Sequence, residues 1–128
     1  MPHVVLEGVI DLESYVQQFE PIFLRNDRDV LRADHIFLSR DTRTVLIEAL
    51  ALEAGRKQPF YVKVSAHDRG GATVRIDPMT HPERSEGVRT LVAEIGADLL
   101  RRSPDARLRV TNLDMPSPDS GKGEGQQR

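Results

Sequence analysis

The chain begins with MPHVVLEG (residues 1–8). This stretch has most weight in the choice of fold. Its β-branched and apolar residues favour a strand, and Gly8 is typical of a bulge or a close backbone approach. Removal of Met1 would leave Pro2 as an N-terminal secondary amine, and such amines titrate near about pH 8. Pro2 is therefore a candidate general base and acid, although proline also suits the first residue of a strand.

The composition is that of an ordinary globular domain. The chain has 128 residues, 38% of them apolar and 30% charged, and its formal net charge is −2. We therefore expect no nucleic acid or membrane partner. With no cysteine, four scattered histidines and no glycine-rich phosphate loop, neither a metal site nor a cofactor is expected. The N-terminus lacks the features of a signal peptide, so we expect a cytoplasmic protein.

Two segments have the apolar spacing of helices. In the first, Asp11 is placed as N-cap, and apolar residues from Leu12 to Phe23 follow at helical spacing with a kink at Pro21. The second is expected to begin at Thr80 in a capping box with Glu83. An apolar stripe then continues from Val88 to Leu100.

Strands are expected between and after these helices. The alternation of apolar and polar residues is clearest in FYVKVSA, and DRGG marks a turn after it. The full set of expected strands is 3–10, 35–40, 44–52, 60–66 and 107–113, with 72–76 as an added hairpin arm.

The order of these elements predicts an α+β fold of the β-α-β-β-α-β type, a sandwich with two helices on one face of a mixed sheet. The folded domain is expected to span residues 2–113. Residues 114–128, rich in Pro, Ser, Gly and charge, are expected to form a disordered C-terminal tail. Ferredoxin-like domains and the tautomerase superfamily share this order.

Short motifs favour the second of these families. MPHVVLEG and YVQQFEP (residues 15–21) resemble 5-carboxymethyl-2-hydroxymuconate isomerases, which also have a proline inside their first helix. AGRKQPFYVKVSAHDR (residues 54–69) is similar to an uncharacterised bacterial tautomerase-like family. Together the likenesses cover most of residues 2–102.

This resemblance implies a cofactor-independent tautomerase or isomerase that moves a proton in a small enol or α-keto carboxylate. Pro2 would be the catalytic base. Arg40 or Arg43 would hold the substrate carboxylate, and Arg69 matches the arginine of the uncharacterised family. The isomerases are trimers, so a homotrimer is expected.

Other functions stay open at this level. The segment at 68–78 is longer than in the isomerases, and the C-terminal residues do not match theirs. The same fold could serve as a catalytically silent trimeric module for binding or assembly. A ferredoxin-like dimer that makes no use of its N-terminus is a third alternative.

Overall fold

The computed structural model describes residues 1–116 and shows one sheet with two helices. Residues 117–128 lie outside the described part, and with them most of the tail predicted at 114–128. Leu113 and Met115, at the end of the described chain, pack against the core. In chain order the elements are β1 (His3–Gly8), α1 (Leu12–Gln18), β2 (Ile22–Asn26), β3 (Asp29–Leu38), β4 (Thr44–Glu53), β5 (Arg56–Ala66), β6 (Ala72–Ile76), α2 (Glu86–Arg101) and β7 (Ala106–Thr111).

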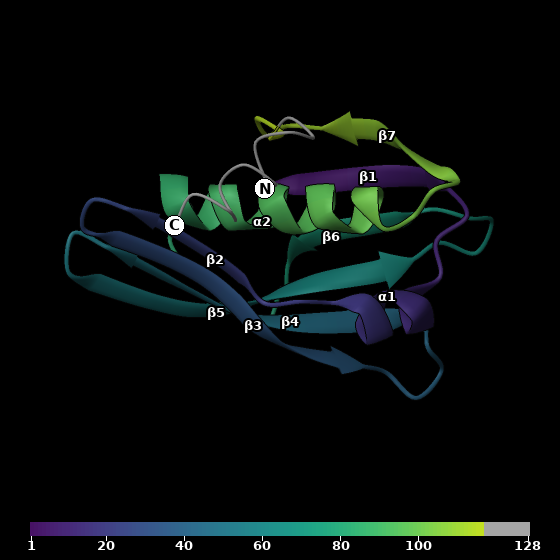
Figure 1. Ribbon diagram of the computed structural model, residues 1–128, viewed down its shortest axis with the longest axis horizontal. Helices are drawn as coiled ribbons and strands as arrows, with labels where there is room; N and C mark the ends of the chain where they lie inside the picture. The colour runs from purple at the N-terminus through teal and green to yellow at the C-terminus, as the bar shows by residue number, and fades with distance from the viewer. Residues whose placement is uncertain (117–128) are drawn as a thin grey trace.

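The sheet has seven strands in the order β2-β3-β4-β5-β6-β1-β7, and every pairing in it is antiparallel. It curls around α2, which lies between the β2–β5 part and the part formed by β1 and β7 (Figure 1). The predicted β-α-β-β-α-β sandwich with a mixed sheet is therefore wrong. Its two halves require parallel crossovers, whereas this chain builds its sheet mainly from hairpins between neighbouring strands.

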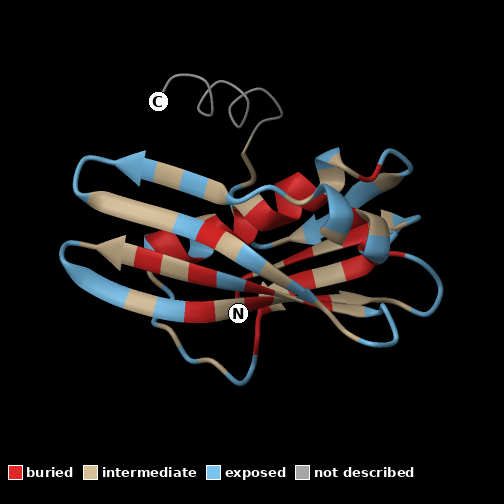
Figure 2. Ribbon diagram, turned by 60° about the horizontal axis from the view of Figure 1, so that its bottom comes forward, coloured by how far each residue is buried: buried red, intermediate tan, exposed pale blue. Residues whose placement is uncertain are grey.

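The buried side chains follow the period of two that an antiparallel sheet imposes. In β4, Val45, Ile47, Ala49 and Ala51 are buried, and the residues between them are not. The same alternation of buried and more exposed residues runs along β5 (Figure 2). One face of the sheet therefore forms the core together with both helices.

The first helix is shorter than its apolar spacing predicts. It ends at Gln18, and the residues after Pro21 form β2 instead of continuing the helix. Proline has no backbone N–H and opposes helix propagation. Ile22 and Leu24 then alternate as a strand, and the two-residue turn at Asp27-Arg28 returns the chain as β3.

The second helix begins later than predicted. Ser85 is its N-cap and accepts a hydrogen bond from the Val88 amide, whereas Thr80 donates to the Asp77 carbonyl oxygen. Residues 77–85 run beside β5, with the Asp77 amide donating to the Tyr61 carbonyl oxygen. The predicted apolar stripe of this helix is buried from Val88 to Leu99, and Leu100 is half-buried. Strand β6 confirms the predicted hairpin arm.

Candidate functional site

Pro2 precedes β1 and its side chain is buried. The carbonyl oxygen of Met1 lies 2.9 Å from His3 Nδ1 and accepts a hydrogen bond of 2.8 Å from Asn112 Nδ2. The start of β1 is thus tied to the residue that follows β7. These contacts hold the N-terminal backbone in place.

The three predicted arginines lie in turns far from Pro2. Arg43 donates to the Ala66 carbonyl oxygen and to Asp68, which joins the β3–β4 turn to the β5–β6 turn. Arg40 and Arg69 are exposed in these same two turns.

These turns lie at the opposite end of β1 from Pro2. A Cβ at Gly71 would approach the Leu6 carbonyl oxygen to 2.4 Å, so the β5–β6 turn packs against the end of β1. The six residues of that strand span about 20 Å. Within a single chain, Arg43 therefore lies near the turn that carries Arg69. The three predicted arginines and Pro2 lie at opposite ends of β1.

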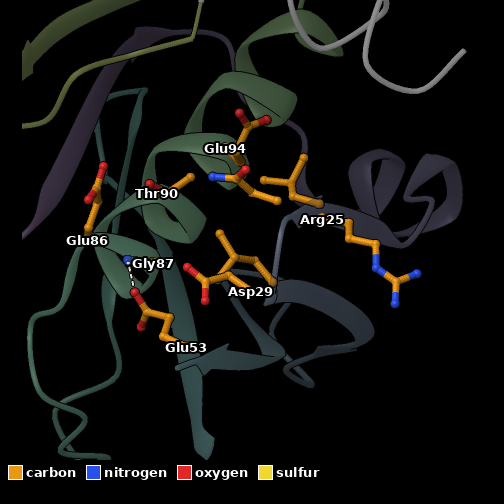
Figure 3. Close-up of a pocket in the computed structure, with 10 residues that line it drawn as sticks. Arg25, Asp29, Glu53, Glu86, Gly87, Thr90 and Glu94 are labelled. Atoms are coloured by element: carbon orange, nitrogen blue, oxygen red, sulfur yellow. Dashed lines mark hydrogen bonds between the residues drawn. The ribbon is translucent and has the colours of Figure 1, made fainter. Parts of the chain in front are cut away.

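A different set of residues lines an open groove of about 420 Å³. It lies where the first turns of α2 face β2, β3 and the end of β4 (Figure 3). Half-buried Leu24 and Leu31 contribute apolar surface. The lining consists of Leu24, Arg25, Asn26, Asp29, Leu31, Glu53, Glu86, Gly87, Thr90 and Glu94.

Glu53 is the most firmly positioned of these side chains. One carboxylate oxygen accepts from Ser85 Oγ at 2.5 Å and the other from the Gly87 amide at 2.8 Å. It therefore satisfies an amide at the N-terminus of α2, where a negative charge is also favoured by the helix dipole. The contact joins the end of β4 to the start of α2 and sets the width of the groove there.

Gly87 allows this close approach. A Cβ built at Gly87 would lie 2.5 Å from the Glu53 carboxyl carbon and 2.7 Å from a Leu31 methyl group. Any larger residue would push the helix away from β3 and β4 or displace Glu53. Gly87 therefore leaves the room that Glu53 and Leu31 occupy beside the first turn of α2.

The groove is strongly acidic. Its lining has four carboxylates, from Asp29, Glu53, Glu86 and Glu94, and one guanidinium, whereas the whole chain has a net charge of only −2. Asp29 is oriented by the Ala54 amide, which donates to it at 3.1 Å. Arg25 extends away from the carboxylates (Figure 3). The arrangement favours a positively charged ligand with an apolar part.

The residues of this groove are not among those predicted from the sequence. Its residues come from segments that share no motif. One usable signal was Ser85-Glu86-Gly87, because serine is a favoured N-cap and glycine permits a close approach. The partner Glu53 could not be found this way.

No family model, curated protein or solved structure matches the chain. In residues 1–116, no three His, Asp or Glu side chains are grouped as metal ligands would be. Neither helix in this part of the chain has the length and apolar character needed to cross a membrane.

Proposed function

We propose that this protein is a non-catalytic binding module that holds a small organic cation, an amine with an apolar body, in the acidic groove beside α2. The observation that carries the proposal is the convergence of four carboxylates from β3, β4 and α2 on one cavity with leucines in its lining. The cavity volume is within the range of small-molecule sites, which combine apolar lining with a few placed polar groups. The cytoplasmic location expected from the sequence stays a prediction.

Two of the carboxylates support binding through their fixed positions. Glu53 and Asp29 are held by backbone amides, so little side-chain entropy is lost when a cation approaches them. Glu86 is the first residue of α2, and Glu94 lies about two turns further along the helix. A cation between these groups would interact with carboxylates on two sides of the groove.

The tautomerase activity expected from the sequence stays a prediction, but the geometry gives it less support. A carboxylate-bearing substrate would be repelled by the acidic groove, and the arginines expected to hold it do not lie near Pro2. The fold on which the resemblance rested is also absent. The proposed amine-binding module agrees with the predicted alternative of a catalytically silent binding module in having no catalytic role. It differs from that alternative in its fold.

The test is calorimetric titration of the full chain with phenethylamine and with phenylacetate, which share a ring and differ in the sign of their charge. We expect phenethylamine to bind and phenylacetate not to bind, and we expect binding to weaken as salt is added. Equal binding of both compounds, or of neither, would contradict the proposal.

Substitutions test the location of the site. Glu86→Gln combined with Glu94→Gln should weaken amine binding by about five- to thirtyfold, since an exposed ion pair contributes about 0.2–1 kcal/mol and partial desolvation adds to this. Glu86→Gln and Glu94→Gln are also measured singly. Glu13→Gln on α1 removes the same type of charge outside the groove and is the matched control for each of these two variants. A Glu13 variant that weakens binding as much as Glu86→Gln would place the site elsewhere.

A further inference from the structure

The sheet has a second face, which points away from both helices. In β4 every second residue from Val45 to Ala51 is in the hydrophobic core, so the residues between them point to the opposite side. The strand register places their neighbours in β2, β3, β5 and β6 on the same side. We call this side of β2–β6 the outer face. Because the sheet curls around α2, the outer face is convex (Figure 1).

Charges are divided unevenly between the two faces of the sheet. The groove on the helix side has four carboxylates and one guanidinium, from Arg25. Besides Arg25, the outer face carries four cationic side chains and only two carboxylates. These six residues are Arg32, Lys57, Lys63, Arg75, Asp34 and Glu48. The small net charge of the whole chain therefore conceals an acidic side and a basic side.

The two carboxylates of the outer face already have partners. Their oxygens lie 3.2–3.7 Å from side-chain nitrogens of His35 and Arg32. Within residues 1–116, none of Lys57, Lys63 and Arg75 forms an ion pair. The outer face therefore presents cations that are available to an anionic ligand.

Two of these cations lie directly opposite each other on neighbouring strands. Lys63 in β5 pairs with Arg75 in β6. Residues paired in this way have Cβ atoms about 4.5–5.5 Å apart, and like charges in such a pair are destabilising. A phosphate group between the two side chains would relieve this repulsion and accept hydrogen bonds from both. The pair is therefore arranged as a binding position for an anion.

Aromatic side chains lie beside these cations on the same face. Phe37 pairs with Leu46, which pairs with Lys63, so the ring and the cation belong to one row across the sheet. Tyr61 precedes Lys63 by two residues, about 7 Å along β5. Phe37 and Phe23 are 51% and 54% exposed, which is unusual for phenylalanine. Exposed rings on a sheet are surfaces on which nucleobases stack.

The shape of the outer face favours a single strand of nucleic acid over a lipid surface. A planar bilayer touches a convex face over a small area, whereas a flexible strand can follow its curvature. Leu46, Leu50 and Leu52 on this face are half-buried, so little apolar surface stands out to enter a bilayer. Phosphates alternate with bases along a single strand, and cations alternate with rings on the outer face.

We propose that the outer face of β2–β6 binds single-stranded nucleic acid, with a phosphate between Lys63 and Arg75 and bases stacked on Tyr61 and Phe37. Phe23 on β2 extends the path across the sheet. The net charge predicted no nucleic acid partner, but a ligand responds mainly to nearby charges, because salt screens exposed charges beyond about 10 Å. The groove lies on the helix side, so this proposal does not depend on what the groove binds.

The test is fluorescence anisotropy of a labelled single-stranded DNA of about ten nucleotides and mixed sequence, titrated with the full chain. We expect saturable binding, and weaker binding of the duplex of the same sequence, whose bases are stacked and cannot reach the rings. If three phosphates are neutralised, the association constant should fall about twentyfold when the salt concentration is raised fourfold. Vesicles of phosphatidylcholine and phosphatidylserine should not displace the DNA.

Removal of single cations locates the phosphate position. Lys63→Gln and Arg75→Gln should each weaken binding about threefold to tenfold and reduce the salt dependence. Each variant also removes one member of a like-charged pair, so neither should lower the urea midpoint of unfolding. Arg89→Gln removes the same charge from an exposed position of α2 and is the matched control, which should bind like the wild type.

A change at Phe37 separates stacking from charge. Phe37→Leu removes the ring but keeps an apolar side chain, and it should weaken binding at least about fivefold without changing the salt dependence. Phe37→Tyr keeps the ring and should bind like the wild type. The proposal would be overturned by no binding of the single strand, by equal binding of the duplex, or by displacement of the DNA by vesicles. An affinity unchanged in both Lys63→Gln and Phe37→Leu would overturn it as well.

Discussion

The hydroxyl of Tyr15 in α1 donates a 2.7 Å hydrogen bond to the buried carboxylate of Asp98 in α2. These residues are 83 positions apart, and their contact joins the two helices inside the curled sheet. Asp98 also accepts from Arg101 and Arg102, and Arg102 donates to the Gln18 carbonyl oxygen at the end of α1. A buried acceptor with several donors is expected to fix the position of the short helix more firmly than its seven residues could alone.

Tyr15→Phe should lower the free energy of unfolding by about 1–3 kcal/mol, because it leaves a buried carboxylate oxygen without its donor. The ring would stay in place, and its edge contact with Phe19 at 5.9 Å between centroids would be kept. Urea unfolding measures the change. Tyr61→Phe removes the other tyrosine hydroxyl, on a half-buried residue of β5, and an equal loss in that variant would show that the Asp98 contact is not the cause.

Stability should fall in alkaline solution through the same tyrosine. Burial raises the pKa of Tyr15 well above its usual value, and the negative charge of Asp98 and the hydrogen bond to it raise this pKa further. Above about pH 10 the unfolded chain loses this proton while the folded chain retains it, so stability is complete below that pH and decreases as pH rises toward the folded-state pKa.

The slope assigned to this one proton is about 1.4 kcal/mol per pH unit. Urea midpoints measured between about pH 8 and pH 11 should therefore decline more steeply for the wild type than for Tyr15→Phe. All other ionisable groups are the same in both proteins, so their effects cancel in the comparison. Parallel pH profiles for the two proteins would show that Tyr15 does not carry the effect.

Sequence periodicity predicted the elements with long, unbroken patterns. The stripe from Val88 to Leu99 is buried in α2, and the alternation of FYVKVSA lies in β5. β2 was missed because Ile22 and Phe23 also fit the helical spacing that starts at Leu12. Two signals indicate the strand. Pro21 opposes continuation of the helix, and the two-residue turn at Asp27-Arg28 joins β2 and β3 as a hairpin.

The sheet order and the groove depend on contacts that no local pattern encodes. β1 pairs with β6 and β7, whose partner residues are about 65 to 110 positions away, so helix and strand assignments alone left the topology open. Glu53 meets Ser85 and Gly87 only after α2 docks on β4. The N-terminal motif therefore suggested a family, but the long-range pairings gave a different fold.

Ser85→Ala should cost about 1–2 kcal/mol of stability, since Ser85 is both the N-cap of α2 and a donor to Glu53. Ser85→Thr keeps both hydrogen bonds and should be nearly neutral. Amide hydrogen exchange of residues 86–88 should become faster in the alanine variant alone. Equal exchange rates in both variants would mean that the start of α2 is held by something other than this hydroxyl.

Gly96→Ala should destabilise the protein even though alanine favours a helix by about 1 kcal/mol over glycine. A Cβ at Gly96 would lie 2.9–3.0 Å from the side-chain carbons of Val4, where α2 crosses β1, and overpacking of this kind costs about 1–3 kcal/mol. Because both backbones are held by the surrounding core, neither can retreat without losing other contacts.

The compensating change is Val4→Ala, which removes the methyl groups that the new Cβ would meet. Alone, Val4→Ala should destabilise through the cavity it creates, and the double variant should be more stable than the sum of the two single losses predicts. Chemical unfolding of all four proteins measures this coupling. Strict additivity would show that α2 and β1 have moved apart to accept the alanine, and that Val4 does not set their separation.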